Sequence, residues 1–228
     1  MNVTAGAMAA KEHKLLRVHR LALEELRATD LAGRCAAAGF RWDSAGARIA
    51  FLGEEFALDA GGTALTPAAP ERETDAAALE RHLAAGILIL HYLVRTSGLA
   101  PQGRWVGFDQ LPGGAFYGST FRGRAEAPLA RAFGACPRGL ITAAAALGAG
   151  TAAYGDAAVV VPALPRVPVL AIVWQGDDEL APNAKVLFDA GAEEHLSTED
   201  LTVLGELVTR RLRQGANTRG GEPPCPGS

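Results

Sequence analysis

The 228-residue chain has few cysteines, few lysines and no long hydrophobic run. Its three cysteines are Cys35, Cys136 and Cys225, and no two of them form a C-x-x-C pair. Iron–sulfur and zinc sites are usually built from closely spaced cysteines, and this pattern fits neither. We therefore expect no iron–sulfur cluster in this chain.

Hydrophobic residues never follow one another for long enough to cross a membrane. Ile87–Leu90, continued after His91 by Tyr92–Val94, is one of the most apolar stretches, whereas a membrane-spanning helix needs about 20 residues. The first residues also lack the basic and apolar regions of a secretory signal. These features predict a cytoplasmic protein that has no membrane as a partner.

Positive charge is scarce as well. The basic residues are 19 arginines and 3 lysines, and 25 acidic residues outnumber them, which gives a net charge of −3 at pH 7. Nucleic acid binding depends on a surface rich in lysine and arginine, so the composition argues against nucleic acid as a partner. Hydrophobic residues make up 49% of the chain, a value typical of a folded globular protein.

The spacing of apolar residues predicts a single α+β domain over residues 11–213, with disordered tails at 1–10 and 215–228. Helical spacing predicts helices at 11–29, 30–39, 75–97, 128–133, 140–147 and 198–213. Strands are predicted at 48–52, 55–59, 157–161, 167–174 and 184–188, with residues 60–74 as a surface connection. Helices and strands are segregated along the chain, which favours a small antiparallel or mixed sheet packed against a central helix, 75–97, and a C-terminal helix, 198–213.

Two of these helices carry end signals in the sequence. Asp30 is an N-cap candidate and Gly39 a C-cap candidate for the short helix between them. Ser197 and Asp200 form a variant of the capping box, with Asp in the position where Glu or Gln is usual. The last helix is therefore expected to start at this point.

The segment Trp174–Asp189 carries three consecutive acidic residues between two apolar strands. Asp177, Asp178 and Glu179 could ligate a hard metal cation, or hold one carboxyl group protonated through like-charge repulsion. Their spacing does not match a calcium-binding loop, which needs alternating ligands. A hairpin turn, in which the acids are solvated or cap local amides, is the favoured interpretation.

His91 lies in the apolar stripe of the predicted helix 75–97. A buried imidazole can serve as a base, a metal ligand or a switch. Because no partner lies at helical spacing, a core histidine hydrogen-bonded to the backbone or to a tyrosine is favoured.

Five of the 14 aromatic residues fall within 17 residues, namely Trp105, Phe108, Phe116, Tyr117 and Phe121. Between them, Gly113 and Gly114 would let backbone amides approach a ligand closely. The stretch predicts either a pocket for a flat ligand or a local hydrophobic core, and the core is favoured. The candidate ligand-binding residues are Trp105, Phe108, Gly113, Gly114, Tyr117, His91 and Trp174.

Several blocks, in order along the chain, resemble the family of domains of unknown function numbered 3786. They are Phe51–Gly53, Leu90–Leu93, Trp105–Gly114, Tyr154–Asp156, Leu164–Pro168, Trp174–Glu179, Leu187–Asp189, His195–Leu196 and Glu199–Asp200. Together these blocks cover residues 15 to 213. The family's block F-R-E-L-P-G-G differs here, because Asp109 and Gln110 fill its two charged positions.

The resemblance implies an origin among anaerobic bacteria and archaea and carries no established reaction. Some members of the family look like iron–sulfur proteins with a cysteine-rich segment before the domain, and others are associated with corrinoid and one-carbon chemistry. This chain departs from the first group, because residues 1–40 contain one cysteine.

The sequence leads to one favoured function and two alternatives, with the cofactor and the catalytic residues left open. We expect an accessory domain that binds a small molecule or cofactor in anaerobic corrinoid, one-carbon or iron–sulfur-linked metabolism, in a groove between Trp105–Tyr117 and Trp174–Asp189. One alternative is an acid–base or metal-dependent enzyme that uses the 177–179 loop with His91. The other is an adaptor whose aromatic surface docks a partner protein of that metabolism.

Overall fold

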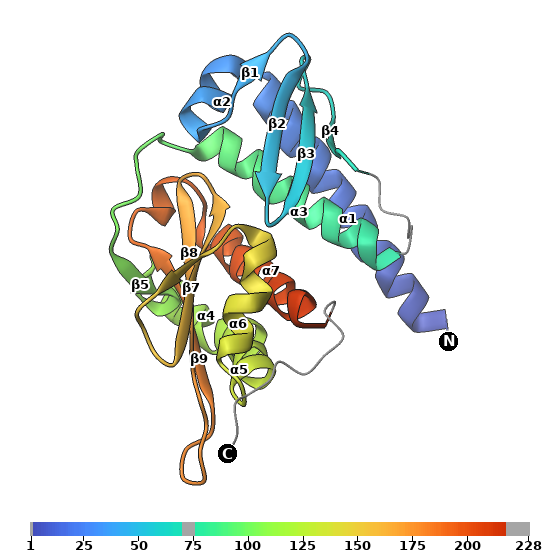
Figure 1. Ribbon diagram of the computed structural model, residues 1–228. Coiled ribbons are helices and arrows are strands. Elements are labelled where there is room, and N and C mark those ends of the chain that lie inside the picture. The colour runs from blue at the N-terminus through green and yellow to red at the C-terminus, as the bar shows by residue number, and fades with distance from the viewer. Residues whose placement is uncertain (1, 70–75, 218–228) are drawn as a thin grey trace. The chain divides into compact units, whose positions relative to one another are not determined.

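The computed structural model describes residues 2–69 and 76–217 of the chain (Figure 1). The chain divides into two compact units. The first unit comprises the described residues up to Leu99 together with Glu194–Leu196, and the second comprises Ala100–Glu193 and the described residues from Ser197 onward. Helices and two antiparallel sheets confirm the α+β class, with two sheets where one was expected. A single domain over residues 11–213 stays a prediction.

The first unit contains three helices and a four-stranded sheet of order β1-β2-β3-β4. Its elements are α1 (Asn2–Arg27), α2 (Leu31–Ala38), β1 (Trp42–Asp43), β2 (Gly46–Phe51), β3 (Glu54–Asp59), β4 (Leu65–Pro67) and α3 (Ala76–Arg95). Helix α1 lies along α3, as Figure 1 shows. It begins nine residues before Lys11, so residues 2–10 are helical where a tail was expected. Their alanine content favours this extension.

The predicted hairpin between β2 and β3 is confirmed, and a further strand follows it. Leu52 and Gly53 form its tight turn with positive φ angles of 48° and 79°. After β3, the Asp59 carboxylate accepts hydrogen bonds from the backbone nitrogens of Gly61, Thr63 and Ala64. This turn returns the chain along β3 as β4, inside the stretch predicted as a surface connection.

Helix α2 is held against the C-terminal end of α3 by hydrogen bonds. The guanidinium group of Arg34 donates to the carbonyl oxygens of Leu93 at 2.7 Å, Val94 at 2.6 Å and Thr96 at 2.9 Å. These carbonyls end a helix and have no partner within it. The buried Tyr92 hydroxyl donates in turn to the Ala38 carbonyl at 2.8 Å. The two helix ends therefore satisfy each other.

The second unit contains a five-stranded sheet of order β5-β9-β8-β7-β6 and four α-helices. Its strands are β5 (Trp105–Gly107), β6 (Gly150–Ala152), β7 (Ala157–Leu164), β8 (Val167–Trp174) and β9 (Asn183–Asp189). Its helices are α4 (Gly114–Phe121), α5 (Ala127–Phe133), α6 (Arg138–Ala144) and α7 (Thr198–Asn217), with a π-helical turn, η2 (Arg122–Glu126), between α4 and α5. Helix α4 was not predicted.

The helices of the second unit cover one face of its sheet (Figure 1). In β8 the consecutive residues from Val169 to Val173 are all buried, so both faces of this strand are covered. The leucine and valine stripe predicted for the last helix is also buried. Across the described residues, no helix has the length and apolar character needed to cross a membrane.

Candidate functional site

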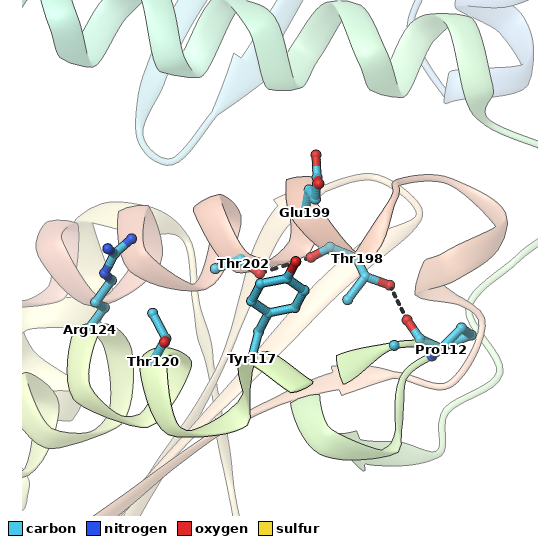
Figure 2. Close-up of a pocket in the computed structure, with 8 residues that line it drawn as sticks. Pro112, Tyr117, Thr120, Arg124, Thr198, Glu199 and Thr202 are labelled. Atoms are coloured by element: carbon cyan, nitrogen blue, oxygen red, sulfur yellow. Dashed lines mark hydrogen bonds between the residues drawn. The ribbon is translucent and has the colours of Figure 1, made fainter. Parts of the chain in front are cut away.

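A pocket of about 410 Å³ lies in the second unit between α4, η2 and the first turn of α7 (Figure 2). Its volume falls in the range of small-molecule sites, roughly 300–1,000 Å³. The residues that line it are Pro112, Gly113, Tyr117, Thr120, Arg124, Thr198, Glu199 and Thr202. Polar side chains surround one aromatic ring, so the pocket can offer both hydrogen bonds and a flat apolar contact.

The two adjacent glycines at the start of α4 have different roles. Gly113 has a left-handed φ of 73° and lines the pocket, with open space where a side chain would begin. At Gly114, by contrast, a Cβ atom would lie 1.9 Å from the carbonyl oxygen of Phe108. The glycines were expected to let the backbone approach a ligand closely. At Gly114 it is the Phe108 carbonyl of the protein itself that makes the close approach, and only Gly113 faces the pocket.

The first turn of α7 forms the opposite wall, and the predicted capping box builds it. The Ser197 hydroxyl donates to Asp200 Oδ2 at 2.6 Å, and the Asp200 backbone nitrogen donates back to Ser197 Oγ at 3.1 Å. Next to this box, Thr198 Oγ1 donates to the Pro112 carbonyl at 2.8 Å and joins the two walls (Figure 2). Thr202 Oγ1 donates to the Thr198 carbonyl at 2.9 Å.

The π-helical turn η2 places a cation at one end of the pocket. The backbone nitrogen of Ala127 bonds to the carbonyl of Arg122, five residues earlier. Such turns contain one extra residue and are frequent at functional sites. Here Arg124 lines the pocket, 3.4 Å from the carboxylate of Glu206. Glu126 is buried and accepts from the backbone nitrogen of Val186 at 3.4 Å.

Of the predicted ligand-binding residues, two line this pocket, Gly113 and Tyr117. Phe108 is buried and stacks on Phe121 with ring centroids 4.3 Å apart, as a core residue does. Trp105 packs against a small cluster of buried residues on the sheet. Trp174 is 36% exposed at the end of β8. The aromatic stretch therefore supplies both a local core and one wall of a pocket.

The groove expected between the aromatic and the acidic segments is filled by backbone pairing. Trp105 pairs with Asp189 and Gly107 with Leu187 in the antiparallel ladder of β5 and β9. Neighbouring strands lie about 4.8 Å apart, which leaves no room for a ligand between them. The observed pocket lies instead between the residues that follow β5 and the start of α7.

His91 is half-buried on α3 in the first unit, and a different histidine is fully buried there. His195 is 1% exposed, and its Nδ1 lies 2.8 Å from Thr96 Oγ1. Its ring centroid is 6.2 Å from that of Tyr92. For position 91 a core histidine hydrogen-bonded to the backbone or to a tyrosine was expected, and that hydrogen bond stays a prediction. His91 itself is only half-buried, which the wide apolar stripe did not reveal.

The acidic loop joins β8 to β9, so the predicted hairpin is confirmed. Asp177 Oδ1 accepts hydrogen bonds from the backbone nitrogens of Leu180 at 2.7 Å and Glu179 at 2.9 Å. These bonds hold the pKa of the Asp177 carboxyl below its ordinary value. In the part of the chain that the structure describes, no three His, Cys, Asp or Glu side chains gather as metal ligands do. Metal binding by Asp177, Asp178 and Glu179 stays a prediction, for elemental analysis of the untagged protein and of Asp177→Ala to test.

Sequence reasoning missed the threonines and the arginine that line the pocket. Thr198 and Thr202 are four residues apart, a spacing that puts both on one face of a helix. Thr120 and Arg124 repeat that spacing between α4 and η2. Two polar i, i+4 pairs are a signal available from the sequence, but nothing local indicates that the two pairs face each other.

The fold and the pocket define an α+β protein whose second unit carries a site of small-molecule size. The chain belongs to the family described as Domain of unknown function (DUF3786), whose model matches residues 30–211. The resemblance seen in the sequence is thereby confirmed, and two of its blocks, Trp105–Gly114 and Glu199–Asp200, contribute residues to the pocket. No curated protein and no solved structure matched the chain.

Proposed function

We propose that the second unit binds a small organic molecule in the pocket between α4 and α7. The observation that carries this proposal is the pocket itself, with five polar side chains arranged around the Tyr117 ring. Such a combination of a flat apolar surface and a few convergent polar groups is typical of ligand sites. Among its eight lining residues there is no cysteine, histidine or serine, so the lining favours binding over nucleophilic or histidine-based catalysis.

We further propose that this binding serves an accessory role in cytoplasmic, anaerobic metabolism linked to corrinoid, one-carbon or iron–sulfur chemistry. The support for this context is the family resemblance alone. The pocket's volume of about 410 Å³ lies near the lower end of the range for ligand sites. A complete corrinoid is too large to be enclosed there, so the proposal concerns a smaller metabolite of such a pathway.

A thermal-shift screen of the whole chain against a metabolite library tests the binding proposal. A ligand that binds only the native state raises the melting temperature in a concentration-dependent manner. We expect Thr202→Trp, which fills the pocket, to abolish the shift. Thr142→Trp, at an exposed position on α6, should leave it intact. If no compound shifts the native protein, or if both variants respond like it, binding in this pocket is refuted.

An adaptor function is the second candidate, because α4 exposes two neighbouring aromatic side chains. Phe116 is 88% exposed and Tyr117 is 57% exposed. Exposed aromatic residues of this kind are frequent anchors of protein interfaces. Light scattering and pull-down with the native protein and with Phe116→Ala test this function. A partner that is retained in full by Phe116→Ala would contradict an aromatic docking site, and a small-molecule shift that persists in this variant would separate the two functions.

A further inference from the structure

We infer that the pocket selects a neutral ring compound that carries adjacent hydroxyl groups, as a sugar or the ribose of a nucleoside does. This inference rests on the proposed binding function and specifies its ligand class. Three observations carry it. Two threonine hydroxyls already donate their protons to backbone carbonyls, the positive charge beside the pocket is paired with a carboxylate, and one face of an aromatic ring is exposed.

The threonines of α7 present lone pairs to the pocket. Thr198 Oγ1 donates its proton to the Pro112 carbonyl, and Thr202 Oγ1 donates its proton to the Thr198 carbonyl. A carbonyl oxygen can only accept, so the direction of both bonds is settled. Each hydroxyl oxygen then has accepting capacity left and no proton to give. A ligand that satisfies them must bring O–H or N–H donors.

The one cation of the pocket lining already has a partner in the protein. Arg124 lies 3.4 Å from the Glu206 carboxylate, and Glu199 supplies a negative charge to the same lining. The positive end of the α7 dipole meets the carboxylates of Glu199 and Asp200 in its first turn. A phosphate group would meet a carboxylate and two accepting hydroxyl oxygens. These features disfavour an anionic ligand and favour a neutral one.

The ring of Tyr117 supplies the apolar surface. Its side chain is 57% exposed and stands between α4 and the α7 turn that carries Thr198 and Thr202 (Figure 2). Aromatic faces pack against the C–H face of sugars and against planar bases alike. A ligand that lies on this ring can direct hydroxyl groups to the threonines. Because Thr198 and Thr202 lie on neighbouring turns of one helix face, a ring with two adjacent hydroxyl groups can offer one donor to each.

Ligand-observed NMR with the whole chain tests the inference, because it detects millimolar binding. The probes are D-ribose, adenosine, 2′-deoxyadenosine, adenosine 5′-monophosphate and putrescine. We expect adenosine to bind, and 2′-deoxyadenosine to bind at least about fivefold more weakly because it lacks one hydroxyl. Competition by ribose would identify the sugar alone as sufficient, and failure of ribose would identify the nucleoside as the source of the diol.

Paired variants show whether the named groups make the contacts. Thr202→Val keeps the shape of the side chain and removes its oxygen, and it should weaken adenosine binding about tenfold. Thr142→Val is the matched control on α6. Tyr117→Ala should weaken binding by a similar factor, whereas Phe116→Ala, its exposed neighbour, should not. Circular dichroism of each variant establishes that it is folded.

Four outcomes would overturn the inference. They are equal binding of adenosine and its 2′-deoxy form, tighter binding of the monophosphate than of adenosine, binding of putrescine alone, and binding of none of the five probes. The proposed function fails separately. If a library compound of another class binds and Thr202→Trp abolishes that binding, the pocket is a ligand site and the ligand class is wrong.

Discussion

The carboxylate of Asp189 holds the backbone of Gly103, with 2.7 Å between Asp189 Oδ2 and the Gly103 nitrogen. The other carboxylate oxygen accepts from the backbone nitrogens of Gln102 at 2.8 Å and Gly191 at 2.9 Å. Asp189 is 1% exposed and pairs with Trp105 across the ladder. One buried side chain at the end of β9 therefore determines where the chain enters β5, and β5 leads directly to the pocket.

Removal of this carboxylate should destabilise the protein strongly. In Asp189→Ala three backbone N–H groups lose their acceptor, and we expect the free energy of unfolding to fall by about 3 kcal/mol or more. Urea unfolding followed by circular dichroism measures the change. Asp178→Ala, at an exposed position of the acidic loop, should change stability by less than about 0.5 kcal/mol. Equal effects of the two variants would contradict a structural role for Asp189.

The two adjacent glycines at the start of α4 should respond differently to the same substitution. Gly114→Ala places a Cβ atom against the Phe108 carbonyl, and we expect a loss of about 3 kcal/mol from overpacking. Gly113→Ala meets open space and costs only the strain of a left-handed φ, about 1 kcal/mol. Thermal unfolding of both variants checks the order. The reverse order would show that the turn before α4 is built differently.

The guanidinium group of Arg34 should be irreplaceable by an ammonium group. Arg34 donates to three carbonyls at the end of α3, and a lysine cannot reproduce this planar fork. Arg34→Lys should lower the free energy of unfolding by about 1–3 kcal/mol. Arg41→Lys, at an exposed side chain, provides the control for the loss of arginine itself. An unchanged free energy of unfolding in Arg34→Lys would mean that hydrogen bonds to water replace those of the guanidinium group at little cost.

Burial should make Cys35 unreactive and its contribution to stability pH-dependent. Burial raises the pKa of its thiol from an ordinary value of 9.0 to about 11. At pH 8 the native thiol then forms on the order of a hundredfold less thiolate than the unfolded chain, and alkylation should slow by at least that factor. Peptide mass spectrometry after iodoacetamide treatment, with and without urea, measures the ratio. Similar rates in the two states would show that Cys35 is accessible.

The same shift in pKa has a defined effect on unfolding. Because the folded pKa is raised, the unfolded state loses its proton first as the pH increases. The contribution of Cys35 is therefore fully present below pH 9 and is lost as the pH rises through about 11. Urea titrations of the native protein and of Cys35→Ala between pH 7 and pH 10.5 should converge at the alkaline end. A constant difference between them would contradict the shift.

The elements with local signals could be predicted from the sequence. Asp30 and Gly39 flank α2 as expected, and Ser197 and Asp200 start α7 through the bonds that a capping box predicts. Strands β2, β3, β7, β8 and β9 fall where alternation and β-branched runs placed them. These signals act within a few residues, because caps, turns and amphipathic periods depend on near neighbours in the chain.

Several elements that depend on tertiary contacts were missed, among them strand β4 and helix α4. Strand β4 forms because Asp59 folds its turn and β3 offers a free edge. Helix α4 contains two glycines and three aromatic residues, a poor helical composition. It is stabilised by packing, since Phe121 is buried against Phe108 and Phe188.

The sequence by itself determined the class of fold, the family and the ends of the best-marked helices, because each depends on composition, order or local spacing. Only the tertiary structure decided the position of the site. It paired Trp105 with Asp189 and so filled the expected groove, and it brought Thr198 to the Pro112 carbonyl, 86 residues away in the chain. Such a contact has no local signal. It exists only when the packing of α4 and α7 brings both groups together, and the pocket is a product of that packing.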